Sequence, residues 1–80
     1  MTKEEVLKVI SKNIVENLDD MEGQEIDPQK SMKEYGANSL DMIEVVSTSM
    51  RELQIKIPRT ELADIKNIDE RADKFMEYVE

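Results

Sequence analysis

Two residue types are missing from this chain, which contains neither cysteine nor histidine. Without cysteine, the fold uses neither disulfides nor thiolate metal sites. Without histidine, it lacks the commonest acid/base catalyst near neutral pH and the commonest nitrogen ligand of metals. The two absences together exclude Ser-His-Asp triads, histidine-based zinc sites and histidine-based pH switches.

Long hydrophobic runs are missing as well. No apolar segment approaches the length of about 20 residues that a membrane-spanning helix needs. The first five residues, Met-Thr-Lys-Glu-Glu, are too acidic for a secretory signal peptide. We therefore expect a cytoplasmic protein that does not insert into membranes.

Basic side chains are scarce relative to acidic ones. The chain has 11 Lys and Arg against 19 Asp and Glu, which gives a formal charge of −8. A field of this sign repels nucleic acid and anionic membranes, and it attracts proteins with basic docking surfaces. The composition alone fits equally well with an acidic surface that only keeps a small protein soluble.

The chain is also short. With 80 residues it builds one modest core, because folded chains of this size bury only about 60% of the surface that the unfolded chain exposes. A deep cleft in which several catalytic groups converge is therefore disfavoured. We expect a single domain over residues 1–80, a monomer, that binds or carries its substrate and is not an enzyme.

Helical periodicity is strongest in two segments. Thr2 and Glu5 form a capping-box pattern, and the apolar spacing after them predicts a helix from about Lys3 to Asn17. A second helix is predicted from Ser39 to about Leu53. A stretch of twenty residues from Asp19 to Asn38 follows the first helix, with at most one short turn near residues 31–35. Loops of this length in compact domains are often functional.

The last third of the chain predicts two further helices. Pro58 pushes the residue before it toward an extended conformation, and a short helical turn with Thr60 as its cap follows over residues 60–64. Asn67 and Glu70 form a second capping-box pattern. The buried stripe of the last helix is expected to comprise Ile68, Ala72, Phe75, Met76 and Val79. The predicted fold is all-α, a small bundle of three main helices plus one short helix, with a long first loop.

The predicted helix from Ser39 to Leu53 has more apolar surface than one core-facing stripe needs. At about 100° per residue, its polar side chains gather in an arc of roughly 100°. One apolar sector is enough for the core, and a second sector that contains Leu40 and Ile43 extends beyond it. We expect part of the second sector to be an exposed docking strip edged by Asp41 and Glu44. Wider burial between two neighbouring helices is the alternative.

Ser39 stands where this helix begins. Its hydroxyl is expected near unpaired backbone N–H groups and the positive end of the helix dipole, where an attached phosphate would be stabilised. On these grounds alone Ser39 is an ordinary N-cap, because serine is a preferred residue there. Asp41 is ambiguous in the same way, since an acid in the first turn is favourable without any function.

The residues around Ser39 give a stronger signal when they are read together. The run Gly36-Ala37-Asn38-Ser39-Leu40-Asp41, followed by Glu44-Val45-Val46, resembles the prosthetic-group motif of acyl carrier proteins. That motif is Gly-x-Asp-Ser-Leu followed by an acidic helix. The resemblance covers the whole chain, including the helix lengths, the long first connection and the segment 55–58. It implies the helical bundle of acyl carrier proteins and a carrier function.

The resemblance also implies a cofactor and a set of partners. In this family the serine, here Ser39, holds 4′-phosphopantetheine from coenzyme A by a phosphodiester, and the thiol of this arm forms a thioester with the acyl cargo. The implied partners are a phosphopantetheinyl transferase, acyltransferases, decarboxylases and ketosynthase-like enzymes. Contacts with them should be weak and salt-sensitive. The expected contact residues are Asn38, Leu40, Asp41, Ile43, Glu44, Met50, Arg51 and Arg59.

The chain departs from the family pattern at two places. Asn38 stands where the family usually has Asp, so a helix cap is kept and one negative charge is lost. Met50 and Arg51 occupy helix positions that are typically acidic in fatty-acid carriers. The docking face is therefore less negative than theirs, and we expect its partner to be different.

A finer resemblance lies around the predicted short helix. The run Ile55-Lys56-Ile57-Pro58-Arg59, with Glu61-Leu62-Ala63 and Lys66-Asn67-Ile68, is similar to free-standing donor carriers of polyketide β-branching cassettes. Such proteins present an acetyl group, made by decarboxylating a malonyl unit, to an enzyme resembling hydroxymethylglutaryl-CoA (HMG-CoA) synthase. The resemblance implies the same donor role for this chain.

Three other functions remain open on the sequence. The first is a general fatty-acid or polyketide acyl carrier. The second is an unmodified helical adaptor that docks partners through Leu40, Ile43 and Met50, for which Ser39→Ala would keep full biological activity. The third, a small hydrolase that uses Ser39, is the weakest, because the chain offers no plausible base.

Overall fold

The computed structural model describes residues 1–18, 25–62 and 65–79. Within these ranges the secondary structure is helical throughout, as predicted, and contains no strand. The elements are α1 (Lys3–Asn17), the 3₁₀ helix η1 (Met32–Tyr35), α2 (Ser39–Leu53), α3 (Arg59–Leu62) and α4 (Ile68–Met76). No helix in this part of the chain is both long and apolar enough to cross a membrane. The cytoplasmic location stays a prediction.

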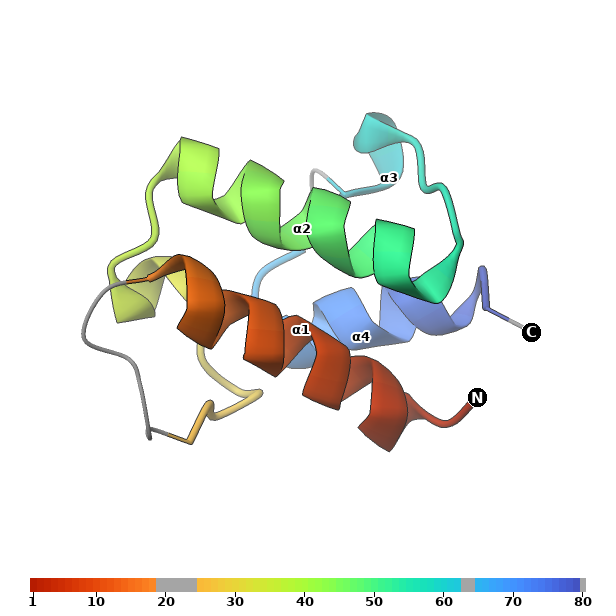
Figure 1. Cartoon of the computed structure of the whole chain (residues 1–80), viewed down its shortest axis with the longest axis horizontal. Coiled ribbons are helices and arrows are strands. Elements are labelled where there is room, and N and C mark those ends of the chain that lie inside the picture. Colours follow the sequence, from red (N-terminus) through yellow and green to blue (C-terminus); the bar gives the residue numbers. More distant parts are fainter. Residues whose placement is uncertain (19–24, 63–64, 80) are drawn as a thin grey trace.

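The three longer helices form the bundle. α1 packs against both α2 and α4, and α3 contacts α4. Figure 1 shows α1 in front of α4 and below α2, with α3 near the C-terminal half of α2. Exposed ion pairs join α1 to its neighbours, from Lys3 to Asp69 and Asp73 and from Lys12 to Glu52, at 2.8–3.0 Å. Pairs of this kind contribute about 0–1 kcal/mol each.

The core is built by the apolar stripes of these helices, whose members recur every three or four residues. Phe75 of α4 is completely buried. A side chain of this kind stabilises the fold by about 1.5–3 kcal/mol when it leaves water. The other buried apolar residues are Val6, Ile10, Ile14, Met32, Ala37, Val45, Val46, Leu53, Ile57, Ile68 and Ala72. Of the stripe predicted for α4, Met76 and Val79 are half-buried and pack against the core, and Val79 lies beyond the end of the helix.

The predicted bounds of α1 and α2 are confirmed, but the details of capping differ. Thr2 caps α1 by accepting the N–H of Glu5, whose carboxylate accepts from the Thr2 hydroxyl instead of returning a bond to the Thr2 backbone. Asn67 caps α4 by accepting the N–H of Glu70 at 2.7 Å. Each of these two predicted capping boxes therefore has, among the described residues, only one of its two hydrogen bonds. The bond present is the one that the cap side chain accepts from the backbone three residues later.

The helix α3 begins one residue earlier than predicted. Its first residue is Arg59, so Thr60 lies inside the helix and is not its cap. The Pro58 carbonyl accepts the N–H of Glu61 at 3.0 Å, which starts the helical turn directly after the proline. The end predicted for this helix, at residues 63–64, lies outside the described residues.

The connection before α2 is fixed by backbone bonds. The carbonyls of Pro28 and Lys30 accept the N–H groups of Asp69 and Ile68 at 2.8 and 3.0 Å, which joins this connection to the start of α4. The 3₁₀ helix η1 follows and is capped at its C-terminus by Gly36, whose φ of +92° lies in the left-handed region that glycine adopts without strain. These bonds position the residues that begin α2.

Candidate functional site

The start of α2 is capped by Asn38, and Ser39 is the first helical residue. The Asn38 side-chain oxygen accepts the N–H of Asp41 at 2.8 Å, and the Asp41 carboxylate accepts the N–H of Asn38 at 3.1 Å. This reciprocal pair is a capping box. The alternative in which Ser39 is only an ordinary cap is therefore excluded, because Asn38 is the cap, as the family motif indicated, and the serine hydroxyl is left available.

The Ser39 hydroxyl is exposed, and the structure gives it no hydrogen-bond partner among the described residues. Asn38 binds the N–H of Asp41, so the first-turn N–H groups of Ser39 and Leu40 are the ones that helix geometry leaves without an acceptor. An anion attached at Ser39 would meet these donors and the positive end of the helix dipole.

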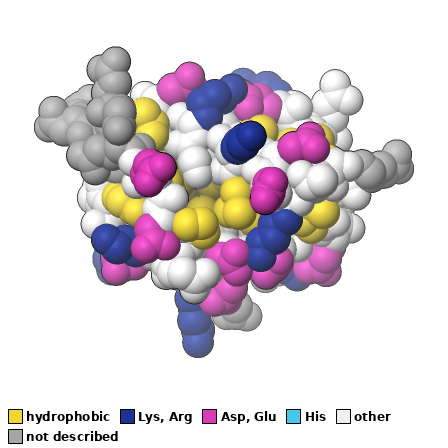
Figure 2. Space-filling model, turned by 90° about the horizontal axis from the view of Figure 1, so that it is seen from below, with side chains coloured by type: hydrophobic (Ala, Val, Ile, Leu, Met, Phe, Trp, Pro, Cys, Tyr) yellow, Lys and Arg dark blue, Asp and Glu magenta, His cyan; other side chains and the backbone are white. Residues whose placement is uncertain are grey.

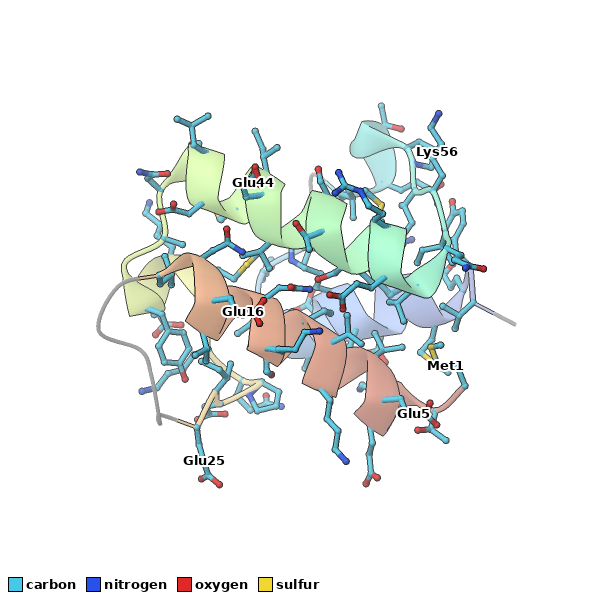
Figure 3. All side chains as sticks on the ribbon, in the orientation of Figure 1. Met1, Glu5, Glu16, Glu25, Glu44 and Lys56 are labelled. Atoms are coloured by element: carbon cyan, nitrogen blue, oxygen red, sulfur yellow. The ribbon has the colours of Figure 1, made fainter. Side chains whose placement is uncertain are left out.

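An exposed apolar strip runs from Ser39 along α2. Leu40 is 74% exposed and Ile43 is 47% exposed, which makes them, with Met1, the exposed large apolar residues of the described chain. Glu44 is exposed beside them and Asp41 is half-buried. The prediction of a partly exposed second apolar sector on this helix is confirmed, and Figure 3 shows Glu44 on this helix.

The other predicted contact residues are more dispersed. Met50 is half-buried, and its sulfur accepts the N–H of Ile57 at 3.4 Å, so it belongs to the wall between α2 and the segment after it. Arg51 is exposed in the last turn of α2. Arg59 is the first residue of α3, and its side chain is not among those that the structure describes.

A cleft of about 450 Å³, here called the Ser39 cleft, lies beside this strip between α2, α3 and the segment that leads into α4. Ser39 is at one end of the lining along α2 and Met50 is at the other. The polar residues of the lining are Ser39, Ser47 and Arg71. Its apolar residues are Met42, Ile43, Val46, Met50, Ile57, Leu62 and Ile65.

Sequence reasoning missed Arg71. It is half-buried in α4, and burial lowers the pKa of its guanidinium. The spacing in the sequence could have indicated this residue. Arg71 lies three residues after Ile68 and four before Phe75, so it shares a helix face with two buried residues. Its approach to α2 and α3 could not be read from the sequence.

The short helix α3 is held in place through Glu61. The Tyr78 hydroxyl donates to the Glu61 carboxylate, and Lys74 lies 3.6 Å from the same carboxylate. The bond to Glu61 is the main cause that raises the pKa of Tyr78 to about 12. The side of the Ser39 cleft that α3 forms is therefore attached to α4 and the residues after it by polar contacts.

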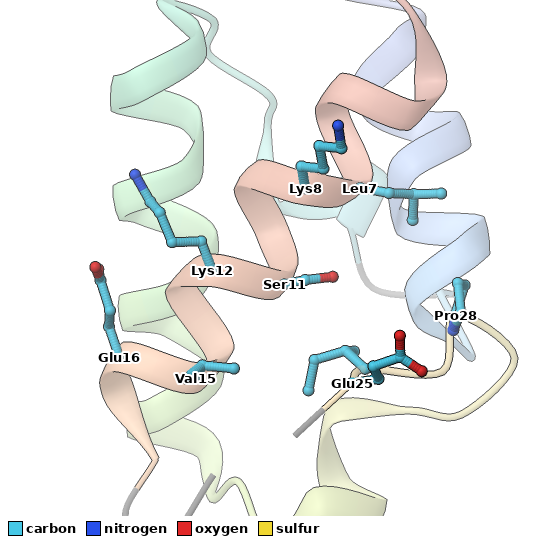
Figure 4. A pocket seen from close by; sticks show the side chains of 9 residues that line it. Leu7, Lys8, Ser11, Lys12, Val15, Glu16, Glu25 and Pro28 are labelled. Atoms are coloured by element: carbon cyan, nitrogen blue, oxygen red, sulfur yellow. The ribbon is translucent and has the colours of Figure 1, made fainter. Parts of the chain in front are cut away.

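A second cleft, of about 750 Å³, lies between α1 and the segment that contains Glu25 and Pro28. Figure 2 shows hydrophobic side chains gathered on the face below α1, with charged side chains around them. In Figure 4, Leu7, Ser11 and Val15 point from α1 toward that segment. Ser11 lies in the middle of a helix, where backbone N–H groups are already bonded. We call this the α1 cleft, and the anion-binding features found at Ser39 do not recur there.

The chain matches known proteins over most of its length. Residues 12–74 match the family model described as "Phosphopantetheine attachment site". The chain is 35% identical over 80 residues to the polyketide biosynthesis acyl-carrier-protein AcpK of Bacillus subtilis (strain 168), with 100% of this chain and 98% of that protein covered. It is also 41% identical to a chain of the crystal structure of the curacin biosynthetic pathway HMG synthase in complex with acetyl donor-ACP. That match has a TM-score of 0.86 and covers 94% of this chain and 96% of the other.

Proposed function

This chain belongs to the phosphopantetheine attachment site family, and on that premise we propose that Ser39 is the residue to which the arm is attached. The chain is an acyl carrier protein, and members of this family are carriers, not catalysts. When bound, 4′-phosphopantetheine supplies a terminal thiol that holds the acyl cargo as a thioester. The observation that supports Ser39 most directly is its exposed hydroxyl at the first residue of α2, beside a cleft.

The residues around Ser39 fit this group. The hydroxyl has no partner to give up among the described residues, and the N–H groups of Ser39 and Leu40 would stabilise a phosphodiester there. The capping box keeps the Asp41 carboxylate bonded to the Asn38 backbone, which offsets part of its repulsion of a phosphate. Apolar walls formed by residues such as Met42 and Leu62 would shelter the uncharged part of the arm or its cargo.

The exposed strip of α2 supports a docking role. Leu40 and Ile43 present apolar surface to a partner, and Asp41 and Glu44 add negative charge at its edge. A partner with a basic rim around an apolar patch would be steered to this face, with an affinity that falls as salt rises. Asn38, Met50, Arg51 and Arg59 stay predicted contacts.

For the cargo, we propose a donor role in polyketide β-branching. The similarity to a chain in the complex of an HMG synthase with acetyl donor-ACP supports this role, as does the resemblance over segment 55–59. An acyltransferase would load a malonyl group, and a ketosynthase-like decarboxylase would convert it to acetyl. That enzyme breaks the bond between the carboxylate and the neighbouring carbon, which keeps the electron pair and takes a proton as carbon dioxide leaves. The acetyl group would then pass to an HMG-CoA synthase-like enzyme.

Intact-mass measurement tests the attachment site. The purified protein is incubated with coenzyme A and a broad-specificity phosphopantetheinyl transferase, and the wild type should gain the mass of one phosphopantetheinyl group. Ser39→Ala should gain none. Ser47→Ala, which changes another serine of the same cleft, and Ser11→Ala, in the α1 cleft, should be modified like the wild type. Equal mass gain in Ser39→Ala would overturn the assignment.

Transfer assays test the donor role. The acetyl-loaded protein should deliver its cargo to an HMG-CoA synthase-like enzyme much faster than it supports chain elongation by an ordinary ketosynthase. Equal support for both reactions would leave a general acyl carrier protein. Full biological activity of Ser39→Ala would instead favour the unmodified adaptor.

A further inference from the structure

Arg71 is a cation inside the Ser39 cleft. It lies in the first half of α4, and its side chain is half-buried at the point where this cleft meets a smaller one of about 220 Å³. Met42, Ile65 and Arg71 line both clefts. The side chains that line the larger cleft with Arg71 are mostly apolar, whereas the smaller cleft is also lined by Lys33 and Lys66.

No carboxylate of the described residues compensates this charge. The ion pairs of the described chain involve Lys3, Lys12 and Lys74, and the structure gives the Arg71 side chain neither an ion pair nor a hydrogen bond within those residues. Burial is the cause that lowers its pKa. A half-buried cation without a partner among the described residues is unfavourable, so the cleft is suited to binding an anion.

Two anions would be available in the loaded carrier, the phosphodiester and a carboxylate on the cargo. The phosphodiester would be held at the exposed Ser39 oxygen, where helix N–H groups serve it. Arg71 lies deeper, among Met42, Leu62 and Ile65, in a cleft suited to a short acyl group. A guanidinium binds a carboxylate with two parallel hydrogen bonds. The position of Arg71 therefore favours the cargo over the phosphodiester.

We propose that Arg71 is a specificity residue that binds the free carboxylate of a malonyl cargo within the Ser39 cleft. This inference rests on the proposed donor function. Arg71 would hold the malonyl form in the cleft, and after decarboxylation the acetyl group offers no carboxylate to bind. The acetyl form is then released from the cleft and accessible to the enzyme that receives it. Arg71 thus separates the form that still has to be decarboxylated from the form that is ready for delivery.

Thermal unfolding of three loaded forms tests this role. The wild type is prepared with the unacylated arm, with acetyl and with malonyl, and each form is verified by intact mass. The malonyl form should melt about 4 °C or more above the acetyl form, because a charge-assisted pair is added in a domain of this size. In Arg71→Gln this difference should disappear. Lys56→Gln, which removes an exposed cation that lines neither cleft (Figure 3), should retain it.

A second measurement covers the case in which Arg71→Gln does not fold. In the wild type, the NMR resonance of the Arg71 side-chain N–H should shift between the acetyl and malonyl forms and should be alike in the acetyl and unacylated forms. Equal melting temperatures for the malonyl and acetyl forms would overturn the proposal. So would an Arg71→Gln effect of the same size in all three forms, which would assign Arg71 to the phosphodiester. Failure to load any arm would contradict the proposed function itself.

Discussion

The two faces of α2 contrast sharply although they share one helix. The inner face buries Val45, Val46 and Leu53 in the core, where α2 packs against α1, while the outer face exposes Leu40 and Ile43. Both faces are largely apolar in sequence. The difference arises because one apolar stripe is enough to pack a helix in a bundle of this size, so the second stripe stays at the surface and is suited to a partner.

Two serines of this helix, Ser49 and Ser39, also differ in burial. Ser49 is fully buried, and its oxygen accepts a hydrogen bond of 2.9 Å from the side-chain amide of Asn13 in α1. Ser39 is exposed, with no partner for its hydroxyl among the described residues. The hydroxyl chemistry is the same, and the surroundings give one serine a structural role and leave the other accessible to an enzyme.

Removing the buried hydroxyl should have the largest effect on stability. Ser49→Ala leaves the amide N–H of Asn13 unsatisfied in the core, and the Asn13 side-chain oxygen already lacks a partner among the described residues. We expect the free energy of unfolding to fall by about 1–3 kcal/mol. Urea denaturation followed by circular dichroism measures it.

The control for this change is Ser47→Ala, which removes an exposed hydroxyl on the same helix. It should alter stability by no more than about 0.5 kcal/mol. Under conditions in which it is folded, Ser49→Ala should still gain one phosphopantetheinyl group. A Ser49→Ala protein as stable as the wild type would show that the two faces of α2 differ less than their burial indicates.

A charge placed on the outer face should act on partners and not on the fold. Ile43→Asp inserts a carboxylate into the exposed strip without disturbing a buried side chain. We expect the affinity for a partner enzyme to fall tenfold or more, which is about 1.4 kcal/mol or more. Calorimetric titration of the carrier with an HMG-CoA synthase-like enzyme measures this change.

Lys8→Ala is a matched control, because it lowers the net charge by the same single unit on an exposed residue of the α1 cleft. It should leave the affinity nearly unchanged. If Lys8→Ala weakened binding as much as Ile43→Asp does, net charge and not the outer face of α2 would decide docking. The two clefts would then be equivalent for partners.

The sequence predicted the bundle well because its main signals are local. The bounds of α1 and α2 follow from capping residues and from apolar spacing along one helix. Asn38 and Ser39 are both good caps, and the bonds with Asp41 decide between them. The comparison with the family motif already indicated a cap at Asn38, and the pattern Asn-x-x-Asp agrees with it.

Other features depend on contacts between segments that are distant in sequence. The burial of Asn13 against Ser49 is set by how α1 packs against α2, and the place of Arg71 in the cleft is set by how α4 lies in the bundle. The attachment of α3 to Tyr78 is of the same kind. Local periodicity contains no information about which polar side chain meets which partner across a helix interface.

The smallest expected effect concerns how the outer face is covered. The inner face of α2 is closed by packing, whereas α3, beside its outer face, is tied to Tyr78 by a contact that titrates. The folded protein raises the pKa of Tyr78 to about 12, above its ordinary value of about 10. The protonated hydroxyl therefore stabilises the fold fully below pH 10, and this stabilisation is lost as the pH rises from about 10 to about 12.

Comparing the wild type with Tyr78→Phe isolates this contribution. The pKa values of Lys3, Lys12 and Lys74 are also raised by their carboxylate partners, so both proteins lose stability in alkali through these lysines. We expect the wild type to lose more than Tyr78→Phe between pH 10 and 12, as measured by urea denaturation at each pH. Tyr35→Phe, which keeps the contact between Tyr78 and Glu61, should behave like the wild type. If the free energy of unfolding fell equally with pH in the wild type and in Tyr78→Phe, α3 would be held beside the cleft by packing, as the inner face of α2 is. The two faces of α2 would then differ only in their exposure.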